Sequence, residues 1–268
     1  MDINNHTFAI CAYEQSPYLQ ECIDSIINQS IKSAVICTTS TPNDYINDMC
    51  TQNNIPLYIN HIKGGLASDW NYAYNKAETQ LITLAHQDDV YDPDFLRQTL
   101  ESLRKSRKPL IAFTNYYEIR DGKAITSNRL LRTKRRMCTP WRVRPFQASR
   151  FIGRRIFMFG NPICCPSVTL VKENLHSKKE MFNTEYKVNC DFLMWVESRD
   201  LPGEFVYCPH QLMGHRIHSE SETTNRIADS TRSIEDLNIL RMLSPEPLAK
   251  LIYKKYIKSQ SSNILRDS

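Results

Sequence analysis

The chain has 268 residues, of which 41% are hydrophobic and 24% charged, and its formal net charge is +5. This composition excludes a disordered chain, and the length allows one or two domains at about 150 residues each. Charged or polar residues interrupt every apolar run well before the roughly 18 residues that a membrane-spanning helix needs. The first six residues, MDINNH, lack the basic-then-apolar pattern of a secretory signal, so we expect a cytoplasmic protein.

Glycine and cysteine exclude several kinds of site. None of the seven glycines is spaced as the G-x-G-x-x-G of a dinucleotide-binding turn or as the glycines of a P-loop. The nine cysteines are odd in number and form no C-x-x-C pair. We therefore expect reduced, buried thiols rather than disulfides or a structural zinc site.

The first 128 residues alternate between strand-like and helix-like segments. Short apolar runs predict strands at 8–12, 34–37, 56–59, 81–85 and 110–113. Helical spacing of apolar residues predicts helices over 19–27 and 70–77, and Asp92-Pro93 opens a third. This alternation predicts an α/β fold, with a mostly parallel central sheet that carries helices on both faces. Ligands of such sheets bind beyond the carboxyl ends of the strands.

The composition changes after residue 128. Residues 129–155 contain ten basic residues and no acidic one, so without this segment the net charge falls from +5 to −5. A strand is predicted at 167–171, a helix at 192–198, a strand at 205–207, and two helices in 229–260, separated near Pro245 and Pro247. Three interpretations of the basic segment compete: nucleic-acid binding, attachment to an anionic membrane surface, or a solvated loop whose long side chains lie on apolar surface.

Three groups of residues could carry chemistry. Asp88 and Asp89 follow a buried strand and could hold a divalent cation and a ribose or diphosphate, or could be an ordinary surface pair. The spacing of His210, His215 and His218 fits no zinc signature, although one of them could complete a metal site at Asp88. Asp191 precedes an apolar run and is either a general base or a residue that stabilises a helix start.

Five segments, in order from residue 8 to residue 221, resemble the family 2 glycosyltransferases of the GT-A fold. Residues 8–30, through FAICAYE (8–14) and YLQECIDSIINQS (18–30), form the first segment and resemble the first strand, turn and helix of that family. Residues 64–71 (GGLASDWN) resemble its glycine-led helix entry. Residues 84–96 (LAHQDDVYDPDFL) resemble its "LDADDIY-P-FL" segment, 190–193 (CDFL) its acidic acceptor-side motif, and 215–221 (HRIHSES) its "YRIH--S" segment. Three positions depart from the pattern: His86 replaces the first acid of D-x-D, Glu14 replaces an asparagine, and 38–41 lack the usual acid.

The resemblance implies a GT-A fold, Rossmann-like and with C-terminal helices, and an inverting transfer of a sugar from a nucleotide diphosphate sugar to an acceptor hydroxyl. Asp88 and His218 would hold Mn²⁺ or Mg²⁺, and Asp191 would act as the general base. The UDP- or dTDP-linked donor would be surrounded by a set of residues around the strand ends: Ala12, Tyr13, Glu14, Thr38, Lys63, Asp69, Asp88 and Asp89.

The same resemblance implies a division of labour along the chain. Residues 1–225 would form the transferase domain, with a nucleotide-sugar-binding half (1–128) and an acceptor half (129–225), and 226–268 a helical extension. The acceptor would be a glycan or a lipid-linked glycan of bacterial surface polysaccharide assembly. The basic segment 129–155 would then attach the enzyme to the inner face of the membrane, with no nucleic-acid partner. A nucleotidyltransferase, a nucleic-acid-binding protein and a catalytically inactive interaction module remain as alternatives.

Overall fold

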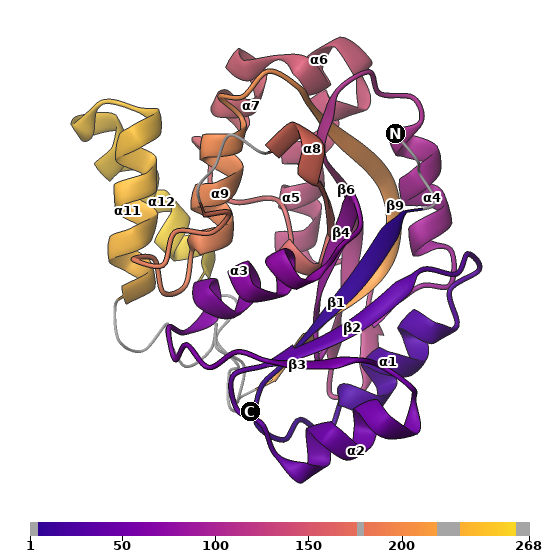
Figure 1. Ribbon diagram of the computed structural model, residues 1–268. Coiled ribbons are helices and arrows are strands. Elements are labelled where there is room, and N and C mark those ends of the chain that lie inside the picture. Colours follow the sequence, from indigo (N-terminus) through magenta and orange to yellow (C-terminus); the bar gives the residue numbers. More distant parts are fainter. Residues whose placement is uncertain (1–4, 176–179, 219–230, 261–268) are drawn as a thin grey trace.

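The computed structural model describes residues 5–175, 180–218 and 231–260. Its strands are β1 (His6–Ala12), β2 (Ala34–Thr39), β3 (Leu57–Ile59), β4 (Leu81–His86), β5 (Val90–Tyr91), β6 (Pro109–Arg120), β7 (Lys123–Ile125), β8 (Val168–Val171) and β9 (Glu204–Ile217). They form one sheet in the order β3-β2-β1-β4-β8-β6-β9-β5, with β7 paired to β6 (Figure 1). The pairings orient β3, β2, β1, β4, β6 and β9 in one direction and β8, β5 and β7 in the other, so the predicted mostly parallel sheet is confirmed.

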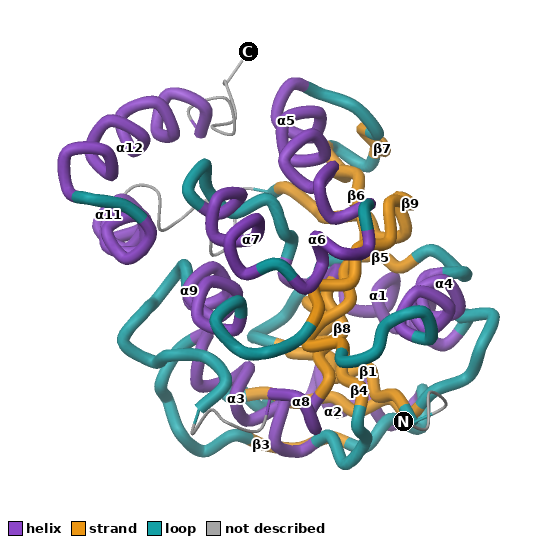
Figure 2. Tube along the Cα trace, turned by 90° about the horizontal axis from the view of Figure 1, so that it is seen from above, coloured by secondary structure: helices purple, strands orange, loops and turns teal. Residues whose placement is uncertain are grey.

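Helices cover both faces of this sheet. Those of the first half are α1 (Leu19–Ile27), α2 (Asp44–Gln52), α3 (Leu66–Lys76) and α4 (Phe95–Leu103). Those of the second half are α5 (Arg129–Cys138), α6 (Arg144–Ala148), α7 (Arg150–Phe157), α8 (Lys172–Leu175), α9 (Cys190–Ser198), α11 (Thr231–Leu243) and α12 (Glu246–Gln260), with 3-10 turns η1 (Thr139–Arg142) and η2 (Cys165–Ser167). Figure 2 shows α1 and α4 on one side of the sheet and α3, α8 and α9 on the other.

The two faces of the sheet form two hydrophobic layers, because successive side chains of a strand point to opposite sides. Phe8 and Ile10 of β1 pack in one layer with α1, α2 and α4, whereas Ala9 packs in the other with α3 and α9. The strand side chains of both layers are buried, which is why the central strands appear in the sequence as continuous apolar runs. All nine cysteines are free, eight of them buried, as the sequence predicts.

The basic segment is folded. It forms α5, η1, α6 and most of α7, and its Trp141 is fully buried against Phe113, Phe157 and Phe205. The interpretation as a solvated loop is therefore wrong, because an aromatic anchor ties the segment to the sheet. No helix in the described part of the chain is both long and apolar enough to span a bilayer.

Two strands are much longer than their apolar runs predict. β6 has 12 residues and β9 has 14, and they pair side by side along almost their whole lengths. Polar residues such as His210 and His215 break the apolar pattern of β9, so the sequence shows only its first part as a strand. The consequence is that β9 carries its last residues to the far edge of the sheet, where β1 and β4 also end.

Candidate active site

The site lies at the carboxyl ends of the parallel strands β1 and β4. Tyr13 follows β1 and Gln87 follows β4, and their groups exchange two hydrogen bonds: the Tyr13 N–H donates to Oε1 of Gln87, and Nε2 of Gln87 donates to the Tyr13 carbonyl, both at 2.9 Å. The side-chain amide thus acts as an extra rung between the two strands. It fixes the loop that carries Asp88 and Asp89, which we call the acidic loop.

Asp88 faces His218 across this edge. Its Oδ2 lies 3.0 Å from Nε2 of His218, and its Oδ1 accepts a hydrogen bond from the Ser16 hydroxyl at 3.0 Å. The side chains of Asp88 and His218 are 23% and 17% exposed, so both can meet a ligand from solvent. The structure thus brings together the two predicted metal ligands.

Asp89 has a different environment. Its side chain is 1% exposed, and its Oδ1 accepts hydrogen bonds from the Arg216 N–H at 2.9 Å and from Nδ1 of His215 at 3.1 Å. Burial alone would raise the pKa of Asp89, but the neighbouring His215 and His86 and the Arg216 N–H outweigh burial and lower it. Asp89 therefore points into the protein and holds the acidic loop to the end of β9. Its side chain does not line the surface where a nucleotide could lie.

His86, which stands where the resembling family has an acid, packs against an aromatic ring. It stacks on Trp70 with ring centroids 5.0 Å apart, and burial lowers its pKa, although Asp89 nearby opposes that shift. Its Nδ1 lies 3.9 Å from Oδ2 of Asp89. The packing of a flat ring between Trp70 and the acidic loop explains why an imidazole fits here.

Arg216 clamps the acidic loop, a role that the sequence analysis did not assign. Its Nε donates to the Asp88 carbonyl at 2.9 Å, its Nη2 donates to Glu21 of α1 at 2.5 Å, and its guanidinium lies over the Tyr18 ring at 4.2 Å. Arg216 and His218 are two positions apart at the end of β9, which places both on the side of Asp88. That period-two spacing is the sequence signal that could have identified Arg216.

Asp69, at the start of α3, faces the ends of β2 and β3. Its two oxygens accept hydrogen bonds from Ser40 and from Nδ2 of Asn60, both at 2.8 Å. Burial raises the pKa of Asp69, and these two donors offset part of the rise. The preceding Gly65 has φ +79, a left-handed conformation that favours glycine and lets the chain turn directly into α3.

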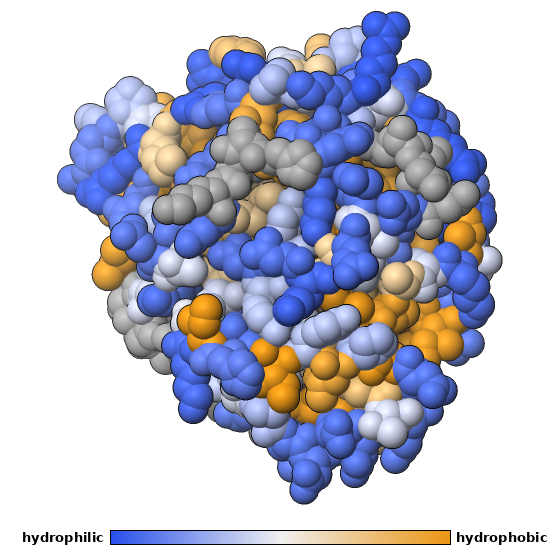
Figure 3. Space-filling view, in the orientation of Figure 1, coloured by the Kyte–Doolittle hydropathy of each residue, from blue (hydrophilic) through white to orange (hydrophobic). Residues whose placement is uncertain are grey.

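The remaining predicted nucleotide residues differ in accessibility. Tyr13 is 47% exposed, Glu14 and Lys63 are exposed, and Ala12 and Thr38 are buried. Glu14 adopts φ 53 and is held there by hydrogen bonds from its N–H to Thr41 at 2.6 Å and from Asn43 to its carbonyl at 3.1 Å. Figure 3 shows a mainly hydrophilic face with hydrophobic side chains gathered in its lower half, over the β1–β3 part of the sheet.

Asp191 lies in the first turn of α9. Its Oδ2 accepts a hydrogen bond from Nδ2 of Asn161 at 3.0 Å. Burial raises its pKa, although the Phe192 N–H, Arg232, Asn161 and Lys134 all lower it. Burial also raises the pKa of the Cys164 thiol, and both Asp89 and Asp191 add to that rise.

The loop before Asp191 is held by the C-terminal helices. Glu235 of α11 is buried, and its carboxylate accepts hydrogen bonds from three successive N–H groups, those of Lys187, Val188 and Asn189, at 2.6, 3.1 and 2.8 Å. Asn189 directly precedes α9. The extension is therefore part of the framework of the site, a contact that no local sequence pattern indicates.

The basic segment divides between two places. Lys134 of α5 lies near the second half of β6: its Nζ is 5.4 Å from the centroid of the Tyr116 ring. The pKa of Asp191 is raised by burial and that of His215 is raised by Asp89, and the Lys134 charge offsets a part of each rise. By contrast, η1 and α6 pack near the first half of β9, well before His215 (Figure 1). Within the segment, α5 thus lies beside Tyr116, which pairs with Met213 in the second half of β9, whereas η1 and α6 lie by the first half of that strand.

Within the described residues there is no cluster of three or more His, Cys, Asp or Glu side chains arranged to hold a metal ion. The Asp88–His218 pair could supply two ligands. This set suits a metal that takes its other ligands from water and from substrate phosphates, which is the usual mode of Mg²⁺ binding at phosphate-transfer sites.

Comparison with known proteins gives a family match and fold neighbours. The family model described as "Glycosyl transferase family 2" matches residues 7–177. Among curated relatives, chondroitin synthase of Pasteurella multocida (strain Pm70) is 25% identical over 124 residues. That alignment covers 44% of this chain and 13% of the synthase, so the chain corresponds to only a small part of that relative.

Solved structures share the whole fold at low identity. The Staphylococcus aureus TarS fragment 1–349 superimposes with a TM-score of 0.65 at 11% identity, covering 98% of this chain and 75% of that one. The mannosyltransferase PcManGT of Pyrobaculum calidifontis, solved with GDP-Man and Mn²⁺, gives 0.62 at 13% identity, with 96% and 75% covered. These similarities confirm the predicted GT-A architecture.

Proposed function

Because the chain belongs to glycosyl transferase family 2, as the match over residues 7–177 shows, we propose that it transfers a sugar from a nucleotide diphosphate sugar to an acceptor hydroxyl, with inversion. The observation that carries this proposal is the approach of Asp88 and His218 to 3.0 Å at the carboxyl edge of the sheet. A carboxylate and an imidazole this close can share one divalent cation, and this edge is where α/β sheets bind ligands.

Asp88 and His218 would hold Mn²⁺ or Mg²⁺ together with the diphosphate of the donor. A cation in this position supplies electrostatic stabilisation of the leaving diphosphate. The Mn²⁺ in the mannosyltransferase structure and the UDP-GlcNAc in a further TarS complex support this assignment. Ser16 orients the other oxygen of Asp88, and Arg216 holds the loop backbone, so the carboxylate is preorganised before the donor arrives.

The nucleoside of a UDP- or dTDP-linked donor would lie over the ends of β1, β2 and β3. The ring of Tyr13 is exposed there and offers a stacking surface, next to the Ala12 backbone and Glu14. Asp69 would accept hydrogen bonds from the nucleoside, and the exposed Lys63, on the loop after β3, would contact its phosphates. Thr38 is buried, so its hydroxyl, 3.4 Å from the Ile10 carbonyl, would fix the β1–β2 edge beneath the nucleotide.

Asp191 would remove the proton from the acceptor hydroxyl as that oxygen attacks the anomeric carbon and the sugar–diphosphate bond breaks. Its raised pKa makes it a stronger base than an ordinary surface aspartate. Asn161 points an N–H at one oxygen and so fixes the direction of the carboxylate. Attack from the side opposite the leaving diphosphate would give inversion.

The acceptor would be a glycan or lipid-linked glycan of bacterial surface polysaccharide assembly. The names of the curated relatives, chondroitin synthase and hyaluronan synthase of Pasteurella multocida, support a glycan acceptor. We propose residues 1–128 as the donor half, 129–225 as the acceptor half and 226–268 as the extension that supports Asp191. The exposed cations of 129–155 would attach the protein to the inner face of an anionic membrane.

The experiment is to incubate the purified chain with Mn²⁺ and a panel of UDP-, dTDP- and GDP-sugars, and to follow release of the nucleoside diphosphate. The proposal predicts slow hydrolysis of one donor that stops on chelation and resumes when Mn²⁺ is restored. Turnover of a nucleoside triphosphate with a sugar phosphate, and of no nucleotide sugar, would instead identify a nucleotidyltransferase and contradict the proposal.

A further inference from the structure

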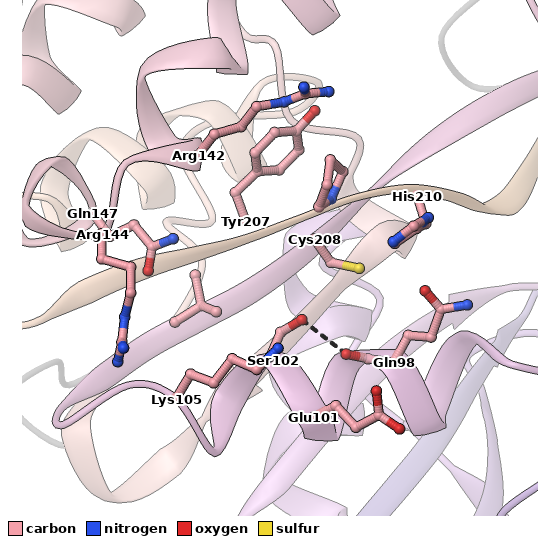
Figure 4. A pocket seen from close by; sticks show the side chains of 12 residues that line it. Gln98, Glu101, Ser102, Lys105, Arg142, Arg144, Gln147, Tyr207, Cys208 and His210 are labelled. Atoms are coloured by element: carbon pink, nitrogen blue, oxygen red, sulfur yellow. Dashed lines mark hydrogen bonds between the residues drawn. The ribbon is translucent and has the colours of Figure 1, made fainter.

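A second cavity lies away from the donor site, between α4, the η1–α6 connection and β9. It measures about 250 Å³. Figure 4 shows Glu101 of α4 and Lys105, two residues after that helix, along one wall, and Arg142, Arg144 and Gln147 along the opposite wall, with β9 residues between them. His210 closes one end. It precedes His215 by five residues along β9, so the cavity lies beside an earlier part of that strand than the acidic loop does.

The charges around this cavity are unbalanced. Glu101 is its only acidic lining residue, and that carboxylate pairs with Nη1 of Arg97 at 3.0 Å. The side chains of Lys105, Arg142 and Arg144 make no hydrogen bond or ion pair with any residue that the structure describes. Three cations therefore surround a small space in which their charges are not neutralised by the protein.

Buried groups fix the β9 side of the cavity, although its Pro209 and His210 are themselves exposed. The pairing of β6 with β9 is interrupted after Thr114–Cys208 and resumes at Asn115–Gln211, so Pro209 and His210 bulge out of the sheet. Asn115 holds this bulge, because its Nδ2 donates to the Pro209 carbonyl at 2.7 Å while its Oδ1 accepts from the Tyr207 hydroxyl at 2.8 Å. Bulges commonly redirect side chains at binding sites, and here the bulge places His210 at the cavity.

The opposite wall is equally restrained. Gln147 is buried, its Nε2 donates to the Trp141 carbonyl at 2.8 Å, and its own carbonyl accepts from Nη1 of Arg199 at 2.8 Å. The backbone on both sides of Arg144 is thereby anchored. The cationic side chains are flexible, but the frame that presents them is not.

We propose that this cavity binds a phosphate group, carried either by a soluble phosphorylated compound or by a lipid headgroup, at a site separate from the donor diphosphate. The guanidinium of Arg144 can form two parallel hydrogen bonds to phosphate oxygens, and the Lys105 ammonium adds a point charge from the facing segment just after α4. Arg142 lies on the wall beside Tyr207 and contributes to the same positive field. Two of the arginines that the sequence analysis assigned to a membrane surface thus line a defined pocket.

The test is isothermal titration with inorganic phosphate in EDTA, which prevents metal-dependent binding at Asp88. Wild type and Asp88→Ala should bind phosphate equally. The double variant Lys105→Glu/Arg144→Glu should bind it roughly tenfold more weakly or worse, because charge-assisted hydrogen bonds are lost. The matched control Arg129→Glu/Arg136→Glu reverses two exposed cations of α5 outside the cavity and should bind like wild type. Arg144→Gln, which removes the positive charge without introducing a negative one, replaces the double variant if that one does not fold.

A vesicle arm separates the two sources of phosphate. Sedimentation with phosphatidylcholine vesicles, with and without phosphatidate, is compared for the same variants. Cavity-dependent sedimentation with phosphatidate identifies a lipid headgroup, and phosphate binding without sedimentation identifies a soluble compound. The proposal is overturned if wild type does not bind phosphate, or if the control double variant loses as much affinity as the cavity variant, which would indicate only a diffuse positive field.

Discussion

Asp88 and His218 are 130 residues apart in the chain, yet Oδ2 of the aspartate lies 3.0 Å from Nε2 of the histidine. The contact exists because β9 runs the full height of the sheet beside β6 and delivers its end to the loop after β4. Arg216, two residues earlier, holds that loop by its backbone. A metal site built this way depends on the register of a 14-residue strand as well as on its two ligands.

Replacing His218 by alanine should weaken Mn²⁺-dependent UDP binding without abolishing it. The variant loses one neutral ligand but keeps the carboxylate. We therefore expect the UDP affinity measured with Mn²⁺ to fall about ten- to a hundredfold, the range typical when a residue around a metal site is replaced. Titration calorimetry measures it. The control His210→Ala removes an imidazole from the same strand away from Asp88, and it should leave UDP affinity unchanged. Equal losses in both variants would contradict the role of His218.

Replacing Asp191 by asparagine should leave donor binding intact and remove turnover. General-base catalysis contributes about 10²–10⁴-fold in rate, and the amide keeps the size of the side chain but cannot take the proton. Steady-state assays of kcat, with donor affinity measured by calorimetry, check this. A variant within a few-fold of wild-type kcat would show that Asp191 is structural.

The pH dependence of kcat should carry the signature of Asp191. Because its pKa is raised, activity should fall as pH drops through a value above the ordinary aspartate range, where the base becomes protonated. Asn161→Ala removes a donor to the charged form, so it should move this acidic limb to still higher pH. If the acidic side of the kcat–pH profile does not shift in Asn161→Ala, Asn161 does not affect the ionisation that controls kcat.

Glu235→Ala should lower both stability and kcat. Three backbone N–H groups lose their acceptor, and hydrogen bonds to a buried charged group contribute about 1.5–3 kcal/mol each in favourable cases, so we expect a total loss of at least ~2 kcal/mol. Urea unfolding, steady-state kcat and donor KM are the measurements, with KM unchanged because the donor half is untouched. Glu246→Gln, an exposed glutamate of α12, is the control and should change neither. A fall in stability with normal kcat would separate the extension from the active site.

The stability of the protein should fall in mild acid because of His6. Burial lowers its pKa from 6.5 to about 3, so below pH 6.5 the unfolded chain binds a proton that the folded chain does not. Between pH 7 and pH 5 this group alone costs about 2 kcal/mol of unfolding free energy. His6→Gln, whose amide can still bond Thr83, should remove that much of the pH dependence, while His61→Gln, at an exposed position, should not. Identical slopes in all three proteins would refute the assignment.

The sequence predicted the elements whose side chains are apolar on both sides. β1, β2 and β4 appear as unbroken apolar runs because both faces of each are covered, and α1 shows its buried stripe from Leu19 to Ile26. The second half of β9 could not be found this way. His215 and Arg216 contact the acidic loop and are polar. Polar residues at these positions interrupt the apolar pattern by which a buried strand is found in a sequence.

The candidate site was only partly predictable for a similar reason. Asp88, Asp191 and His218 stand in recognisable segments, but their supporting groups do not. Glu235 and Asn161 act through contacts with residues 46 and 30 positions away, and no local spacing encodes such contacts. The resemblance places Asp89 beside the nucleotide. In the structure its Oδ1 contacts His215 and the Arg216 N–H, and these contacts bury the side chain.

The measurement that tests the central claim most directly is calorimetric titration of the wild-type protein and Asp88→Ala with UDP, with and without Mn²⁺. Asp48→Ala, an exposed aspartate of α2, serves as the control for loss of one negative charge. We predict that Mn²⁺ strengthens UDP binding in wild type and Asp48→Ala, and that this metal effect disappears in Asp88→Ala while its melting temperature stays near that of wild type. Unchanged Mn²⁺-dependent affinity in folded Asp88→Ala would contradict the assignment of the metal and diphosphate site.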